Sequence, residues 1–186
     1  NKVETKRRSF LFTATYTIGA VGLGATIWPL VDQMNPDASV KALSTTEVDV
    51  SSIEPGKAIT VLWRGKPIFI KRRTEKEINE AATVNLKDLK DPEKDSDRAK
   101  NPEWLVMVGV CTHLGCSPKY YPKMEPQPWD EPWIGGFFCP CHGSKFDMAG
   151  RVFQSVPAPL NLVVPPHYFI DEKTIMIGID QGEVLA

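Results

Sequence analysis

The pattern of apolar and polar positions separates a long uncharged run near the N-terminus from a body of short alternating segments. No residue from Ser9 to Val31 is charged, a run of 23 residues. As a helix rising about 1.5 Å per residue it would span roughly 34 Å, enough to cross a bilayer core of about 30 Å. A cleaved signal peptide is the alternative, but its apolar region is typically only about 7 to 15 residues. The run therefore predicts a retained membrane helix that ends at the interface near Trp28 and Pro29.

A polar stretch follows the run. Residues 32–46 (DQMNPDASVKALSTT) are small and polar and lack apolar periodicity, which is typical of a linker. We therefore expect an anchor over 1–31, a flexible hinge over 32–46 and a β domain over 47–186. A hinge of this kind would let the outer domain move.

Strand patterns dominate from residue 47 onward. The segments 59–63 and 68–71, joined by Arg64-Gly65-Lys66-Pro67, predict a hairpin. Thr74 followed by Glu77 predicts a capped helix that runs to about residue 82. An apolar strand is expected over 105–110, and further strands at 152, 162–164, 168–170 and 175–179. The fold class is mainly antiparallel β, carried on an N-terminal transmembrane helix.

Two segments are expected to be loops. Residues 87–100 (KDLKDPEKDSDRAK) alternate in charge and predict a solvated loop. Residues 117–136 contain five prolines together with Tyr120, Tyr121, Trp129 and Trp133. We interpret these aromatic side chains as the packing of a loop-rich insertion, not as a ligand site.

Charge is distributed unevenly between the start of the chain and its body. Residues 1–8 carry four basic and one acidic side chain, so the remainder of a chain with a formal net charge of -1 is net acidic. An acidic body argues against nucleic acid as a partner. Basic residues before a membrane helix keep the N-terminus cytoplasmic, which sends the residues after Asp32 across the membrane. The stretch Arg7-Arg8-Ser9-Phe10-Leu11 is similar to a twin-arginine export signal, or forms only the positive flank of the helix.

The candidate chemistry is concentrated in two short boxes. The first box, residues 111–116 (CTHLGC), and the second box, residues 139–144 (CPCHGS), hold all four cysteines and two of the three histidines. Four protein ligands could form a tetrahedral zinc site, although C-x-H is tighter than the usual zinc spacing and two cysteines would have no role. A c-type haem needs C-x-x-C-H, and the second box is one residue short. An all-cysteine iron-sulfur cluster would leave the histidines unexplained, whereas a [2Fe-2S] centre with two His and two Cys ligands explains both residue types.

Both boxes resemble those of Rieske [2Fe-2S] proteins of the subtype with an extra cysteine in each box. The resemblance implies one cluster per chain, inside an antiparallel β Rieske domain with a small cluster-binding subdomain at about 108–160. It implies Cys111 and Cys139 as ligands of one iron, His113 and His142 as ligands of the other. A disulfide would join Cys116 to Cys141, which fits an oxidising compartment.

The same resemblance assigns roles to neighbouring residues. Ser144 matches the serine that hydrogen-bonds a cluster sulfide, and residues 157–159 match a proline loop that covers the cluster. Phe146 stands where many respiratory members have a tyrosine that donates to a ligand sulfur. Leu114 is either a core residue or an exposed contact at the cluster tip, and the resemblance favours the tip. His167 is expected to be structural.

The segment 63–69 (WRGKPIF), followed by Arg73-Thr74, is similar to the Rieske subunits of the cytochrome bc1 complex, bacterial type. This implies a subunit of a quinol-cytochrome-c reductase that is active only in the complex. His142 would take a hydrogen bond and proton from ubiquinol, and domain movement would deliver the electron to cytochrome c1. Cytochrome b and cytochrome c1 would be partners in a dimeric complex of the bacterial inner membrane, with the domain on the periplasmic side. Alternatives are an exported Rieske subunit of another oxidoreductase, such as arsenite oxidase, and a zinc-stapled binding module.

Overall fold

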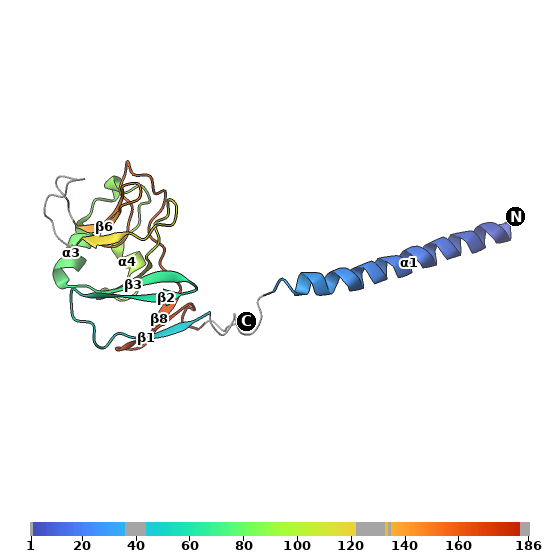
Figure 1. The fold of residues 1–186 in the computed structure, drawn as a ribbon, viewed down its shortest axis with the longest axis horizontal. Helices are drawn as coiled ribbons and strands as arrows, with labels where there is room; N and C mark the ends of the chain where they lie inside the picture. The colour runs from blue at the N-terminus through green and yellow to red at the C-terminus, as the bar shows by residue number, and fades with distance from the viewer. Residues whose placement is uncertain (1, 36–43, 122–132, 134, 183–186) are drawn as a thin grey trace. The chain divides into compact units, whose positions relative to one another are not determined.

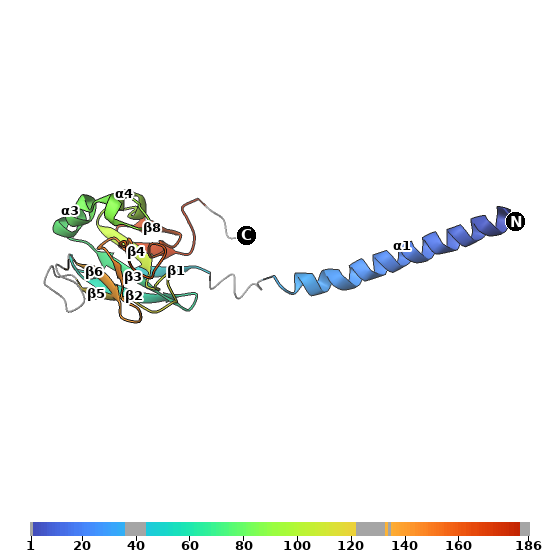
Figure 2. The same ribbon diagram turned by 90° about the horizontal axis from the view of Figure 1, so that it is seen from above.

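The structure is a computed structural model that describes residues 2–35, 44–121, 133 and 135–182 (Figures 1 and 2). The chain divides into two compact units, Asn1–Ala42 and Leu43–Ala186. Most of the hinge expected over 32–46 falls on residues 36–43, outside the described residues. Its boundaries therefore stay a prediction.

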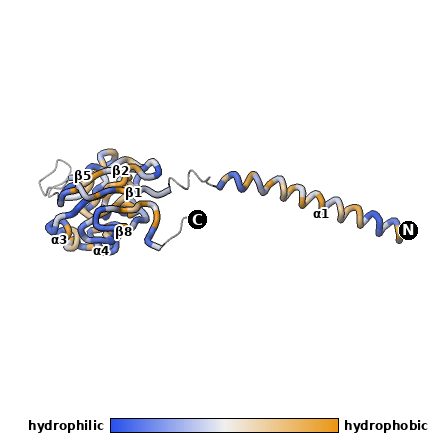
Figure 3. The backbone as a smooth tube through the Cα atoms, turned by 90° about the horizontal axis from the view of Figure 1, so that it is seen from below, coloured by the Kyte–Doolittle hydropathy of each residue, from blue (hydrophilic) through white to orange (hydrophobic). Residues whose placement is uncertain are grey.

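The first unit is dominated by helix α1, Lys2–Asp32. Within it, Val3–Asp32 contains an 18-residue window of mean hydropathy 1.5, and none of that window is buried. Figure 3 shows hydrophobic positions along most of the helix and hydrophilic ones near its start. The hydroxyls of Thr13, Thr17 and Thr26 each donate to the carbonyl four residues earlier. These bonds satisfy the hydroxyls within the helix, as an apolar surrounding requires. The predicted apolar helix is confirmed.

The second unit contains three antiparallel sheets of three strands each among the described residues. Their strand orders are β1-β9-β8, β2-β3-β4 and β5-β6-β7. The strands are β1 Thr46–Asp49, β2 Ala58–Trp63, β3 Lys66–Arg72, β4 Trp104–Val108, β5 Lys119–Tyr121, β6 Gly136–Cys139, β7 Ser144–Phe146, β8 His167–Asp171 and β9 Thr174–Ile177. Three short helices, α3 Glu75–Thr83, η1 Leu86–Asp88 and α4 Asp95–Arg98, lie between β3 and β4 in sequence. The expected mainly antiparallel β class is confirmed.

Strand β4 is buried along its whole length because it lies between two hydrophobic cores. Successive side chains of a strand point to opposite faces. Trp104, Val106 and Val108 join the core formed with β1, β3 and β9, whereas Leu105 and Met107 join the core that contains both boxes. The strand that delivers the first box is thus fixed from both sides.

The predicted hairpin and capped helix are both present. Trp63 pairs with Lys66, so the turn is only Arg64-Gly65, and both turn residues have positive φ. Such a two-residue turn matches the twist of antiparallel strands. At α3, Glu77 N donates to Thr74 Oγ1 at 3.3 Å, and Thr74 N donates to the Glu77 carboxylate at 2.9 Å. The two bonds form the predicted capping box.

The predicted solvated loop at 87–100 is only partly correct, because exposed residues such as Lys87 and Lys94 alternate with buried ones. Leu89, Asp95, Arg98 and Ala99 are buried, and the segment contains η1 and α4. At least three of its charges are paired: Arg98 Nη1 lies 2.6 Å from Glu93 Oε2, and the Arg73 guanidinium lies 2.6 Å from Asp95. Local charge alternation cannot distinguish solvated charges from charges that meet distant partners.

Two further expectations need correction. No strand forms at 162–164, because Leu162 N donates to Gly150 O while Val163 O accepts from Val108 N, so the segment follows no single partner strand. The insertion 117–136 contains the short strand β5, and Trp129 lies outside the described residues. Two of its aromatic residues pack inward, Tyr120 against Phe137 at 5.1 Å between ring centroids and Trp133 with an exposure of only 1%. The expected packing role of these two residues is confirmed.

Candidate metal centre

The two boxes fold into turns of the same design. In the first, Gly115 N donates to Cys111 O at 3.0 Å, and in the second Gly143 N donates to Cys139 O at 3.0 Å. Both glycines have positive φ, a conformation that L side chains rarely adopt. Each box is therefore a tight turn in which a glycine four residues after the first cysteine closes the loop.

Two different elements present these turns. The first follows β4 through Gly109, where a Cβ atom would meet the Phe69 ring at 2.4 Å, so a larger residue would have to displace that ring. The second is the connection of the β6–β7 hairpin, in which Cys139 pairs with Ser144. The first cysteine of each box is thereby anchored in the hydrophobic core that contains Leu105 and Phe137.

Cys111 and Cys139 form a pair of buried free thiols. Each is 2% exposed, and both belong to the same hydrophobic core. Burial raises the pKa of the Cys111 thiol, the neighbouring Cys139 raises it further, and hydrogen bonds from the His113 amide and the Ser144 side chain oppose the rise. A metal ion would replace these protons, because thiols bind metal as thiolates.

The two histidines of the boxes lie together. The rings of His113 and His142 are edge to face, with centroids 4.8 Å apart. His113 is half-buried and its Nδ1 atom is buried without a hydrogen-bond partner among the described residues, while His142 is exposed. A buried ring nitrogen without a partner is costly, about 1–3 kcal/mol, unless another ligand satisfies it. The donor set of two thiols and two imidazoles therefore fits a metal centre.

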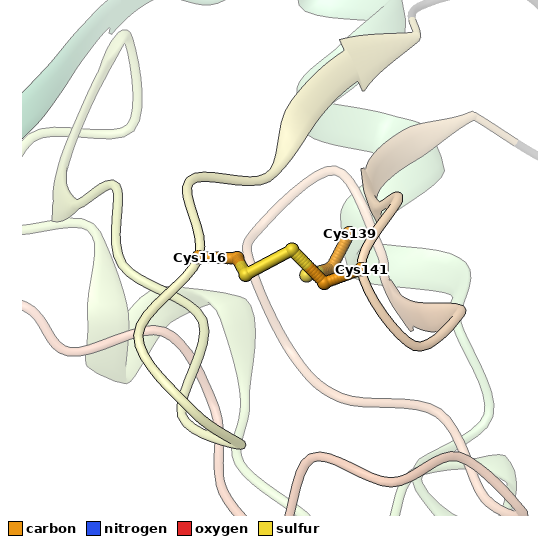
Figure 4. Close-up of side chains that lie close together, drawn as sticks. All are labelled: Cys116, Cys139 and Cys141. Atoms are coloured by element: carbon orange, nitrogen blue, oxygen red, sulfur yellow. A yellow bond between two sulfur atoms is a disulfide. The ribbon is translucent and has the colours of Figure 1, made fainter.

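The other two cysteines form a disulfide between the boxes. Cys116 and Cys141 are bonded and lie 25 residues apart in sequence. Figure 4 shows the Cys139 side chain beside this bond, and the three sulfurs lie within 4.8 Å of one another. Since two of the three are bonded to each other, only Cys139 of this group has a thiol for a metal. The predicted disulfide is confirmed.

The remaining candidates differ in position and burial. Ser144 and Phe146 are fully buried, and Ser144 Oγ accepts a hydrogen bond from Ala158 N at 3.0 Å. Leu114 is 71% exposed and is no core residue. His167 lies in β8, buried, with Nδ1 2.8 Å from Pro165 O, and burial lowers its pKa.

Sequence reasoning missed several residues that fix the 152–161 segment beside the boxes. Thr112 Oγ1 donates to Leu160 O at 2.6 Å, and Asn161 Oδ1 accepts from Val152 N at 2.8 Å. Lys90 Nζ donates to Val156 O and Ala158 O. These contacts join residues up to 68 positions apart, so no local spacing indicates them.

Comparison with known proteins gives a consistent result. The family model described as Rieske [2Fe-2S] domain matches residues 45–166, and the model described as ubiquitinol-cytochrome C reductase Fe-S subunit TAT signal matches residues 1–37. The ubiquinol-cytochrome c reductase iron-sulfur subunit of Rhodospirillum rubrum is 51% identical over 175 residues, 94% of this chain and 93% of that protein. The subunit of the same name from Allochromatium vinosum is 45% identical over 97% of this chain and 92% of its own length. Among solved structures, a chain of "Hyperthermophilic respiratory Complex III" is 30% identical, covers 86% of this chain and 94% of its own, and has a TM-score of 0.48.

Replacing both disulfide cysteines, Cys116→Ser with Cys141→Ser, should separate the boxes. For a loop of this length the cross-link stabilises the folded chain by about 3–4 kcal/mol. We expect a lower denaturation midpoint of the full chain in detergent, and faster reaction of Cys111 and Cys139 with a thiol reagent after metal removal. Ser117→Ala, a change next to the first box, is the control. An unchanged midpoint with equally protected thiols would show that the boxes stay together without the bond.

Proposed function

This chain belongs to the Rieske iron-sulfur subunits of ubiquinol-cytochrome c reductase, and on that premise we propose that it takes one electron and one proton from ubiquinol and passes the electron to cytochrome c1. An electron-transfer role with a Rieske [2Fe-2S] cluster follows from family membership. The observation that supports the site is that two matching turns carry two buried thiols and two imidazole rings, with the ring centroids 4.8 Å apart.

We assign Cys111 and Cys139 to one iron and His113 and His142 to the other. Both thiols are buried and free, and His113 Nδ1 has no hydrogen-bond partner among the described residues. When bound, a cluster with two thiolates instead of four carries less negative charge and accepts an electron more readily, at about -150 to +300 mV against about -400 mV for plant-type clusters. The Cys116–Cys141 bond holds the boxes together without donating a ligand.

His142 is the residue that meets ubiquinol. It is exposed, and it lines an open hollow of about 540 Å³ together with Gly143, Phe153 and Pro157. The ring nitrogen not used for iron can accept a hydrogen bond from a quinol hydroxyl and then hold its proton. His113 is half-buried and less accessible.

Exposed apolar side chains around the boxes supply a contact surface for cytochrome b. Leu114 and Leu160 are 71% and 57% exposed, and Thr112 joins their segments through its bond to Leu160 O. Apolar contacts of this kind exclude water from the contact with a partner. Proton transfer to His142 would then occur in a dry interface.

The chain is a membrane-anchored subunit, with α1 as the anchor. We place the basic flank of α1 in the cytoplasm of a bacterium and the Rieske domain on the periplasmic side of the inner membrane, because basic residues stay inside. Cytochrome b and cytochrome c1 are the partners, within a dimeric complex. Similarity to reductase subunits over more than nine-tenths of their length leaves no observation that favours arsenite oxidase.

Domain movement is part of the proposal. The polar composition of residues 32–46 supports a hinge between the anchor and the Rieske domain. Movement on this hinge would carry the cluster from the quinol site to cytochrome c1.

Electron paramagnetic resonance of membranes that contain the protein tests the function directly. A rhombic signal should be present after reduction with ascorbate, because a His-ligated cluster has a high potential. Inhibitors of quinol oxidation should change that signal if His142 meets the quinol. A signal that appears only after reduction with dithionite would indicate a low-potential ferredoxin-like role. A metal-loaded protein that gives no signal with either reductant would indicate zinc.

Phe146→Tyr should raise the reduction potential. The new hydroxyl can donate to a ligand sulfur, and a net hydrogen bond of about 1 kcal/mol corresponds to about 40 mV for one electron. Redox titration of the signal measures the change. Phe138→Tyr, which adds a hydroxyl to the paired strand β6 of the same hairpin, is the control. An unchanged potential in Phe146→Tyr would refute a tuning role for this position.

Two prolines introduced near Ala38 should slow turnover of the complex and leave the cluster spectrum unchanged. Proline restricts φ and removes an amide donor, so it stiffens a linker. Quinol-dependent reduction of cytochrome c in membranes measures turnover, and two alanines at the same positions are the control. Normal turnover with the prolines would contradict domain movement on this hinge.

A further inference from the structure

The turn formed by residues 156–159, here called the proline turn, is held by a lysine from a distant segment. Lys90 Nζ donates to Val156 O at 2.9 Å and to Ala158 O at 3.2 Å. Proline has no amide N–H, so Pro157 and Pro159 give this turn fewer backbone donors of its own. The carbonyls of Val156 and Ala158 accept hydrogen bonds from the lysine ammonium group instead.

The backbone around Lys90 is fixed independently of its side chain. Leu89 is fully buried, Lys90 N donates to Val152 O at 2.9 Å, and Gln154 N donates to Asp88 O at 2.9 Å. The Gln154 side chain adds a bond to Leu89 O at 2.8 Å. Replacing the Lys90 side chain should therefore leave the packing of the two segments in place.

The proline turn reaches the metal centre through one serine. Ala158 is fully buried, and its N–H donates to Ser144 Oγ at 3.0 Å. Ser144 pairs with Cys139 across the β6–β7 hairpin, and its side chain opposes the rise in the pKa of the Cys111 thiol. A hydroxyl has one proton to donate, so an acceptor position occupied by Ala158 N–H limits the directions in which that proton points.

From this chain of contacts we propose that Lys90 is a positioning residue for the iron-sulfur centre. By holding the carbonyls of Val156 and Ala158, it keeps the Ala158 amide on Ser144 and thereby directs the Ser144 hydroxyl toward the sulfur atoms. Hydrogen bonds to the sulfurs set the potential of such clusters. The inference rests on the proposed function, because it needs the cluster at Cys111 and Cys139.

The test compares midpoint potentials of the cluster in membranes. Lys90→Met removes the ammonium donors and the charge at similar length, whereas Lys90→Arg keeps both. Lys87→Met is the matched control, since it removes a positive charge three residues away, on the hollow that His142 lines, from a side chain that makes no hydrogen bond to the proline turn among the described residues. Lys90→Met should lower the midpoint potential and change the paramagnetic signal. The midpoint potentials of Lys90→Arg and Lys87→Met should stay close to that of the wild type.

A double variant shows whether the effect passes through Ser144. In a Ser144→Ala background, Lys90→Met should produce no further shift of the potential. An equal shift in both backgrounds would overturn the proposal, as would a Lys87→Met shift as large as that of Lys90→Met. An unchanged potential in Lys90→Met would also overturn it.

If Lys90→Met fails to assemble the cluster, a second measurement tests the proposal. In metal-free full-length chains in detergent, hydrogen exchange of the Ala158 amide should be faster in Lys90→Met than in the wild type, and unchanged exchange would contradict the proposal. Failure of the proposed function is recognised separately, because wild-type membranes would then lack the ascorbate-reduced signal.

Discussion

The cluster-binding half of the domain depends on two buried arginines that join segments far apart in sequence. Arg151 lies 2.7 Å from Asp147 through Nε and donates to Glu93 O and Ala81 O. Arg98 donates to Ala149 O and Leu162 O. Burial raises the pKa of Asp147, and the arginine beside it opposes the rise. An arginine left without partners here would be a buried unpaired charge, at a cost of about 3–5 kcal/mol.

These contacts explain how a small site can be rigid although it is built from loops. The arginines fix the chain that follows β7, and the same chain then forms the proline turn and returns to β4 through Val163. The two boxes close by the same glycine turn and are joined by one disulfide. The proposed metal ligands are thereby held in position by a surrounding framework, which would suit a centre that changes charge without large rearrangement.

The exposed and buried sides of the site have separate roles. Cys111, Cys139 and Ser144 lie inside, where, in the proposed assignment, they would control the electronic environment of the cluster. His142 and Leu114 lie outside, where a substrate and a partner protein can reach them. In the proposed function, this division would allow one domain to tune its potential from the core and to exchange protons and electrons at its surface.

The sequence by itself determined the features whose information lies within a few neighbouring residues. The uncharged run indicated α1, Thr74 with Glu77 indicated the helix start, and the spacing of the two boxes indicated the metal chemistry. Only the tertiary structure decided the burial and conformation of residues 87–100. Its charges predict a solvated loop, yet Arg98 meets partners 51 and 64 residues away, and Lys90 meets carbonyls 66 and 68 residues away. Hydrogen bonds and ion pairs at such separations depend on how the chain folds back on itself, and no local pattern of side chains encodes them.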